Sequence, residues 1–188
     1  QDIGHLSNPP GAALFGWLGH PDPELVCKLG GICLIKSRKG WKMMDAGDEE
    51  PAASVYSGGT VWGLFPDRIG AIDDDHWRWY RDLPFSKPSG LYAHAGEVKW
   101  VSVATETALY AYAGEWKRHP SPLAAPRGMW GSAPDDVWLV GDDGVAHFDG
   151  ERWQRAEGPR GPLTMVAGRG RDDVWVGGRA GLFRGRPR

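Results

Sequence analysis

Hydrophobic residues occur along this chain in short runs that are bounded by glycine, aspartate and proline. The clearest segment predicts four strands, at residues 128–131, 137–140, 145–148 and 152–155. An Asp-Asp pair at 135–136 and an Asp-Gly pair at 149–150 supply turn signals between them. No run approaches the roughly 18 apolar residues that a membrane-spanning helix requires. The pattern predicts short antiparallel strands joined by tight turns.

The predicted strands of this segment differ in polarity. Residues 137–140 and 145–148 are apolar at consecutive positions, which is typical of strands covered on both faces of the sheet. The fourth strand instead places charge directly after an aromatic residue, as in Trp-Lys-Arg at 116–118 and Trp-Gln-Arg at 153–155. Such a strand is expected at an exposed outer edge.

The same pattern recurs with a nearly constant period. Aromatic residues that open the fourth strand are spaced by 36, 39 and 37 residues: Trp41, Trp77, Trp116 and Trp153. Markers in the second strand are spaced by 35, 38, 38 and 37 residues: Cys27, Trp62, Trp100, Trp138 and Trp175. Two independent markers with one period indicate a repeat protein. Four-stranded antiparallel units of this length that pack side by side form a β-propeller, in which each sheet is called a blade.

The repeats predict the number of blades. They fall at residues 12–44, 52–81, 90–119, 127–156 and 163–188, and the last repeat has no fourth strand. Residues 1–8, with Asp2 to Leu6, lie one period before Trp41 and are in phase with that strand. We therefore predict a single all-β domain over residues 1–188, a closed five-bladed propeller whose last blade is completed by the N-terminal strand. A fragment of a larger propeller is the alternative, which the phase disfavours.

Two segments resemble known propeller repeats. Residues 172–184, Asp-Asp-Val-Trp-Val-Gly-Gly followed by Arg-Ala-Gly-Leu-Phe-Arg, resemble the propeller repeats of two-component regulator sensor ectodomains. Residues 135–153 are similar to a related repeat of secreted bacterial proteins. The resemblance implies a β-propeller and an exported location, and it carries over no catalytic residues. Five-bladed propellers also occur among tachylectin-like lectins and among glycosidases, but the long lectin repeats and the long inner loops of the glycosidases are not seen here.

Composition and the cysteines bear on the compartment. The formal net charge of −2 gives no reason to expect a nucleic-acid partner. The chain begins at Gln1 rather than Met, which fits a processed, periplasmic or secreted bacterial protein. Cys27 and Cys33 flank Gly30 and Gly31. A five-residue loop would place the cysteines opposite each other for a disulfide, whereas a two-residue turn would leave two buried thiols.

Motifs that would carry chemistry are weak. There is no nucleophile motif, phosphate-binding loop or metal-ligand spacing, so no cofactor and no metal are predicted. Asp73, Asp74 and Asp75 favour a solvated turn over a calcium loop, because no spaced glutamate follows. Paired acids recur at the same turn in two repeats, which favours a structural role over acid–base catalysis: Asp135, Asp136, Asp172 and Asp173. The scattered histidines lack ligand spacing, and His147 is expected to be a hydrogen-bonded strand residue: His5, His20, His76, His94, His119 and His147. We therefore do not expect an enzyme.

Two features are candidates for binding. Aromatic residues at equivalent positions of the first strands could stack on a ligand or pack between blades: Trp17, Tyr56, Tyr92 and Trp130. Charge is also uneven, with a balance of −6 over residues 42–75 and +6 over residues 152–188. The arginines chosen as candidate partner contacts are Arg169, Arg171, Arg179 and Arg184. Solvated surface charge without a partner is the alternative.

These features predict a non-catalytic propeller that binds protein or serves as a structural accessory subunit of an extracytoplasmic assembly. The alternative is a lectin, since repeated aromatic sites would give multivalent glycan binding. A glycan-acting enzyme would require a cluster of carboxylates in the central channel. A protein partner or larger complex is expected, a glycan is the second choice, and neither nucleic acid nor a membrane span is expected.

Overall fold

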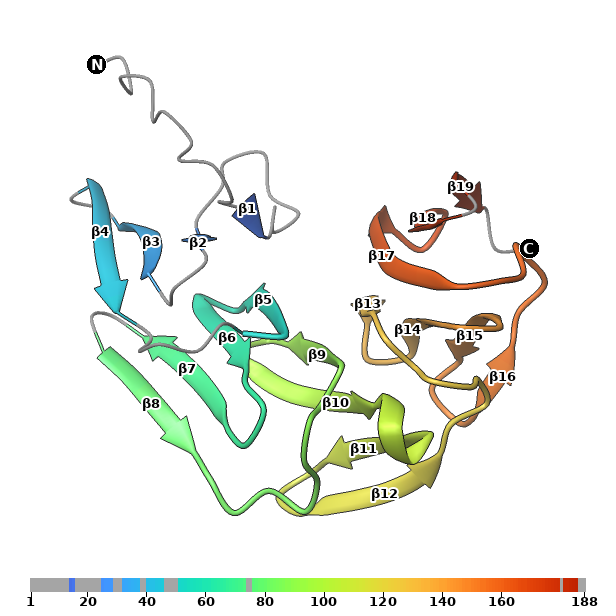
Figure 1. The fold of residues 1–188 in the computed structure, drawn as a ribbon, viewed down its shortest axis with the longest axis horizontal. Coiled ribbons are helices and arrows are strands. Elements are labelled where there is room, and N and C mark those ends of the chain that lie inside the picture. The colour runs from blue at the N-terminus through green and yellow to red at the C-terminus, as the bar shows by residue number, and fades with distance from the viewer. Residues whose placement is uncertain are drawn as a thin grey trace. The chain divides into compact units, whose positions relative to one another are not determined.

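The computed structural model describes the backbone of residues 14–15, 25–28, 32–37, 40–45, 51–73, 76–179 and 181–185, and side chains within 51–72, 77–179 and 181–185. The chain divides into two compact units, residues 1–50 and residues 51–188. Each unit is built from antiparallel sheets, and each is described by itself (Figure 1).

The described residues of the first unit form one four-stranded antiparallel sheet. Its strands pair in chain order: β1 (Leu14–Phe15), β2 (Leu25–Lys28), β3 (Ile32–Ser37) and β4 (Gly40–Asp45). The pairing of β2 with β3 places Cys27 directly opposite Cys33. A disulfide between the two strands requires this register. It corresponds to the five-residue loop considered in the sequence analysis and not to the two-residue turn.

The disulfide itself remains a prediction, because the cysteine side chains lie outside the described residues. We expect Cys27 and Cys33 to resist alkylation in the purified, unreduced and denatured protein, and to be alkylated fully after reduction. Mass spectrometry of the alkylated protein measures both states. Alkylation of both thiols without a reductant would show two free cysteines, and it would also weaken the prediction from the sequence that the protein is exported.

In the second unit, the described residues form three four-stranded antiparallel sheets and one three-stranded sheet. The first sheet comprises β5 (Ala53–Ser57), β6 (Thr60–Leu64), β7 (Ile69–Asp73) and β8 (His76–Tyr80). The next comprises β9 (Gly90–His94), β10 (Glu97–Val103), β11 (Ala108–Tyr112) and β12 (Trp116–Pro120), with a short 3-10 helix at Ala104–Glu106. The third comprises β13 (Met129–Ala133), β14 (Asp136–Gly141), β15 (Gly144–Phe148) and β16 (Trp153–Arg155). The last comprises β17 (Leu163–Gly170), β18 (Asp173–Gly178) and β19 (Gly181–Gly185).

The fold class is a β-propeller with blades of four antiparallel strands, as the sequence predicts. The prediction of a closed five-bladed propeller is wrong, because the described residues form four complete blades. Four sheets have four strands, whereas the sheet β17–β19 has three, and its described part ends at Gly185. The segment Asp2 to Leu6, which was predicted to supply the fourth strand, lies outside the described residues.

Tight turns explain why the strands pair in chain order. Gly58 and Gly59 form the two-residue connection between β5 and β6, where Ser57 pairs with Thr60. Their φ angles of +58° and +86° lie in the left-handed region that glycine adopts without a steric penalty. Two consecutive positive φ angles are characteristic of the hairpin turn whose twist matches that of the flanking strands.

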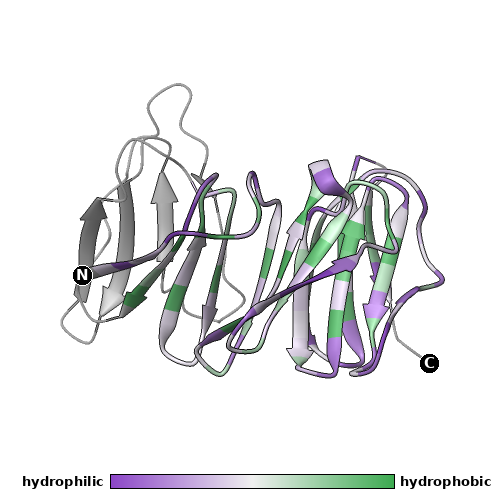
Figure 2. Cartoon of the chain, turned by 90° about the horizontal axis from the view of Figure 1, so that it is seen from below, coloured by the Kyte–Doolittle hydropathy of each residue, from purple (hydrophilic) through white to green (hydrophobic). Residues whose placement is uncertain are grey.

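Hydrophobic side chains fill the spaces between neighbouring sheets. On β14, Val137 and Leu139 face the preceding sheet, while Trp138 and Val140 pack with Leu163, Val174 and Val176 of the following one. Both faces of this strand are therefore buried, which confirms the prediction from its consecutive apolar residues. Figure 2 shows the hydrophobic residues concentrated in the strands and the hydrophilic ones in the connecting loops.

The strands within each blade occupy consistent positions. The first strands contact one another from sheet to sheet: β5 with β9, β9 with β13, and β13 with β17. The fourth strands β12 and β16 expose the charged or polar residues that follow their tryptophans, as predicted for outer edges. No helix in the described part of the chain is long and apolar enough to cross a membrane.

Candidate active site between the last two sheets

The predicted first-strand aromatics do not form a common binding surface in the described residues. Tyr92 is 3 % exposed, and its ring lies so close to Gly131 of the next sheet that an added Cβ would be 2.8 Å from it. Trp130 packs in the same way on Gly168. Both rings therefore pack between sheets, which is the alternative that the sequence left open. Tyr56 is half-buried on β5, and Trp17 lies outside the described residues.

The candidate arginines are exposed, and two of them are paired with aspartates. Arg171 donates to Asp135 at 2.6 Å, and this bond lowers the pKa of the Asp135 carboxyl. Arg184 donates to Asp173 at 2.7 Å and lies 5.4 Å from the centre of the Trp175 ring. Arg169 and Arg179 lie on the surface. Arginine charge at this end of the chain is therefore partly neutralised by local ion pairs.

A buried carboxylate on β14 is held by three side-chain hydrogen bonds. Asp136 begins β14 directly after the turn at Pro134 and Asp135, and it is 1 % exposed. Its Oδ1 accepts hydrogen bonds from Trp138 Nε1 at 3.2 Å and from His147 Nε2 at 2.8 Å. Its Oδ2 accepts a bond from Ser132 Oγ. These donors compensate for the cost of burying the carboxylate.

A related arrangement recurs in the last sheet. Asp173 accepts a hydrogen bond from Trp175 Nε1 at 3.1 Å, and the residue opposite the tryptophan is Arg184 in place of a histidine. Residues at i and i+2 of a strand share one face, so each aspartate reaches the indole two positions on. The recurring aspartates therefore hold tryptophans in the fold. In the sheet β13–β16, Asp136 also fixes the imidazole of His147.

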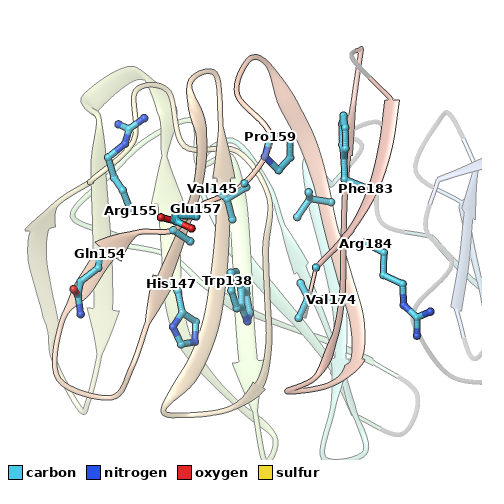
Figure 3. A pocket seen from close by; sticks show the side chains of 14 residues that line it. Trp138, Val145, His147, Gln154, Arg155, Glu157, Pro159, Val174, Phe183 and Arg184 are labelled. Carbon is cyan, nitrogen blue, oxygen red and sulfur yellow. The ribbon is translucent and has the colours of Figure 1, made fainter. Parts of the chain in front are cut away.

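His147 lies at the wall of a cavity of about 680 Å³ between the sheets β13–β16 and β17–β19. Figure 3 shows its ring beside that of Trp138, with centroids 4.4 Å apart, and the residues of the last sheet across the cavity. The opposite wall includes Val174 and Phe183, and Glu157 and Gln154 contribute polar groups. The cavity therefore combines an apolar wall with a few polar side chains, as ligand sites commonly do.

The repeat explains why space remains here. Phe148 pairs with Val137, and Gly185 pairs with Val174, so these two residues occupy equivalent positions. Phe148 packs 5.1 Å from Trp100 and helps fill the preceding gap between sheets, together with Trp153 of the fourth strand. Gly185 has no side chain, and the described part of the last sheet has no fourth strand. The tryptophan of the preceding sheet, Trp138, is consequently left next to a cavity.

The arrangement is suited to proton transfer. Asp136 binds one ring nitrogen of His147, and the other nitrogen, Nδ1, has no partner among the described residues. A carboxylate that orients a histidine and stabilises its protonated form is the arrangement found behind many catalytic histidines. Histidine is also the side chain that most readily exchanges protons near neutral pH. No group of three metal-ligating side chains occurs within the described ranges, and the side chains of Asp73, Asp74 and Asp75 fall outside them.

The comparisons with known proteins indicate the fold only. No family model and no curated protein matches this chain. Its structure is similar to virginiamycin B lyase from Staphylococcus aureus in selenomethionine-substituted form, with 11 % identity over 86 % of this chain and 65 % of that chain, at a TM-score of 0.60. A catalytically inactive variant of the same enzyme with quinupristin gives 12 % identity over 94 % of this chain and 70 % of that chain, at a TM-score of 0.65. This chain thus spans about two thirds of the enzyme's length.

This similarity contradicts the prediction of a non-catalytic, protein-binding accessory subunit with a lectin as its alternative. The solved structures with a similar fold are those of a lyase, so the fold by itself does not exclude catalysis. We predicted that the protein is not an enzyme partly because the repeated motifs have a structural role. Residues that build a scaffold in every blade can still orient a reactive group in one of them. A shared fold at this identity leaves the activity of this chain to be inferred from its own site.

Proposed function

We propose that the protein binds a small molecule between the sheets β13–β16 and β17–β19 and that His147 transfers a proton to or from it. The observation that carries this proposal is the hydrogen bond of 2.8 Å between His147 and the buried Asp136 at the wall of a cavity. Asp136 acts here as a positioning residue, because it touches the imidazole and not the cavity. His147 is the group that reaches the ligand.

The neighbouring side chains support a site for a molecule with both apolar and polar parts. Trp138 and Phe183 offer aromatic surface, and Gln154 and Glu157 offer hydrogen-bonding groups. Arg184 is less available to a ligand. Asp173 binds the guanidinium of Arg184, and the arginine side chain points away from the cavity in Figure 3. The similarity to a lyase adds support, since proton abstraction by a positioned base is a common step of elimination reactions.

The test replaces His147 with glutamine, which keeps a donor for Asp136 but cannot exchange a proton at neutral pH. Virginiamycin B and quinupristin serve as probes, because the similar structures name them. We expect the ring signals of His147 in NMR spectra to shift when one of these two probes binds in the cavity. We also expect conversion of that probe, followed by chromatography and mass spectrometry, to be about 100-fold or more slower in His147→Gln.

A matched control is His119→Gln, because His119 lies 5.3 Å from Trp100 in a different gap between sheets. This variant should convert the probe at the wild-type rate. Equal conversion by the wild type and by His147→Gln would remove the proposed role. Absence of any response at His147 to either probe would exclude these compounds as ligands of the cavity.

A further inference from the structure

The strand β19 forms an exposed edge of the last sheet. It pairs with β18 on one side, and all five of its residues are exposed. The exposed side chains include two large hydrophobic ones, Leu182 at 58 % and Phe183 at 36 %. An edge strand presents a row of unpaired backbone N–H and C=O groups, to which another extended chain can add. The edge of β19 is therefore a candidate binding surface for such a chain.

The preceding sheet indicates which backbone groups of β19 face outward. The strands β15 and β19 both follow a two-residue turn and pair with the second strand in the same register, so Leu182 is the equivalent of Val145. The carbonyl of Val145 accepts a hydrogen bond of 3.0 Å from the N–H of Ala156, on the side of the fourth strand. Successive residues of an antiparallel strand bond to opposite sides. The N–H and C=O groups of Leu182 and Arg184 are therefore expected to point away from β18.

The cavity between the last two sheets corresponds to the place of an aromatic side chain of a fourth strand. In the preceding gap between sheets, Trp153 of the fourth strand lies 5.4 Å from Trp100. Trp153 pairs with Phe148, whose equivalent in the last sheet is Gly185. A strand added to β19 in this register would place an aromatic ring opposite Gly185 and beside Trp138, the equivalent of Trp100. The cavity of about 680 Å³ has room for that ring.

The turn before β19 favours an acidic residue in the added strand. In the preceding sheet, Arg155 of the fourth strand donates to Asp143 of the turn before β15, at 2.8 Å. The equivalent turn of the last sheet consists of Arg179 and Ala180. Arg179 is exposed and has no partner among the described residues. Since this turn carries a base where the other carries acids, the counterpart of Arg155 should be an acid.

We propose that β19 binds a peptide as an added antiparallel strand, with an aromatic side chain in the cavity and an acidic residue two positions later near Arg179. Backbone hydrogen bonds supply affinity in this mode of recognition, and the side chains supply selectivity. Residues at i and i+2 of a strand share one face, so both side chains lie on the side of the preceding sheet. The inference rests on the proposed function in one respect, because it assigns a class of ligand to the same cavity.

The test uses a synthetic peptide with the sequence of residues 151–156 and the change Arg155→Glu, blocked at both ends. This segment contains the fourth strand of the preceding sheet. We expect the peptide to shift the amide NMR signals of Leu182 and Arg184 in a saturable manner and to slow their hydrogen exchange. The amide of Phe183, which faces β18, should change less. Signals that do not respond would overturn the proposal. Slow exchange of both amides in the peptide-free protein would also overturn it, because another segment or a second copy then occupies the edge.

Two further peptides separate the contributions of the side chains. The same peptide with Trp153→Ala should bind about tenfold more weakly, because no ring enters the cavity. The unmodified segment, which keeps Arg155, should bind about threefold more weakly, because an arginine then approaches Arg179. An alanine peptide of undiminished affinity would contradict insertion of the ring. Equal binding of the glutamate and arginine peptides would contradict the pairing with Arg179.

A variant of β19 tests the backbone contacts. Leu182→Pro removes the outward N–H, and proline is tolerated in edge strands where its nitrogen faces solvent. This variant should lose peptide binding, whereas Leu182→Ala keeps the N–H and should bind the peptide nearly as the wild type does. Full binding by Leu182→Pro would contradict strand addition. Should the proline disturb the hairpin, the hydrogen-exchange measurement on the wild type still decides.

His147→Gln separates this inference from the proposed function. The variant should bind the peptide with the wild-type affinity, because binding requires no proton transfer. Peptide binding by a protein whose His147 responds to neither virginiamycin B nor quinupristin would support the inference without the role of His147. Conversion of one of these compounds by a protein that does not bind the peptide would contradict the inference alone.

Discussion

Replacing Asp136 with alanine is expected to lower the free energy of unfolding by about 3 kcal/mol or more. The substitution removes a carboxylate that is 1 % exposed and leaves the donors of Ser132, Trp138 and His147 without their acceptor. Each buried donor that loses its partner costs about 1–3 kcal/mol, and the space left by the carboxylate adds to the loss. Urea denaturation followed by tryptophan fluorescence measures the change.

Asp173→Ala is the matched control for this substitution. Asp173 holds Trp175 in the same geometry, but its side chain is 23 % exposed, so water can take over its hydrogen bonds. We expect a loss of about 1 kcal/mol for this variant. Equal losses for the two variants would contradict the special importance of the buried network. The control also separates stability from function, because Asp173→Ala leaves His147 and its bond to Asp136 in place.

The period of the sheets could be predicted from tryptophan spacing for a physical reason. In each complete sheet of the second unit, the second-strand tryptophan faces the next sheet, and Trp116 and Trp153 pack back onto the preceding one. Large rings at fixed positions in the gaps between sheets must recur at the period of the sheets. The number of complete blades did not follow from the same period, because a repeat in phase does not show that all four of its strands are present.

The proximity of Asp136 to His147 could have been predicted from the sequence. The turn at 142–143 fixes the hairpin so that Trp138 lies opposite His147, and Asp136 shares a face with Trp138. These three residues therefore had to lie close together. Recurrence in the last repeat suggested a structural role alone, since Asp173 and Trp175 are found there too. The histidine was the part that did not recur.

The cavity could not be predicted, because it depends on contacts between sheets. Gly185 has no side chain to fill the gap beside His147, whereas Phe148 fills the gap between the preceding sheets from the equivalent position. Counting charges along the sequence likewise overlooks ion pairs between sheets. The count of arginines near the C-terminus leaves out acidic partners from earlier in the chain. Asp135, for example, lies 36 residues from Arg171 in sequence, but its carboxylate is 2.6 Å from the guanidinium in the fold.

Stability at alkaline pH should depend on Tyr92. Its hydroxyl is buried without a partner in the described part of the chain, and burial raises its pKa from 10.0 to about 12, with further contributions from the negative charges of Asp136 and Asp135. The unfolded chain loses this proton near pH 10, whereas the folded protein keeps it until about pH 12. The contribution to stability is therefore complete below pH 10 and is lost as the pH rises through this window. We expect a loss of about 2–3 kcal/mol from this residue.

Tyr92→Phe removes the ionisable group and the unpaired hydroxyl together. At neutral pH we expect this variant to be as stable as the wild type or more stable by up to about 1 kcal/mol, because no hydrogen bond is lost. Denaturation curves between pH 8 and 12 should show a smaller alkaline loss of unfolding free energy in this variant than in the wild type. Tyr92→Phe should still lose some unfolding free energy at alkaline pH, since burial and the bond to Glu106 also raise the pKa of Tyr110.

The control is Tyr112→Phe, at an exposed position, which should follow the wild-type curve. Identical alkaline slopes for Tyr92→Phe and the wild type would show that Tyr92 ionises in the folded protein as readily as in the unfolded chain.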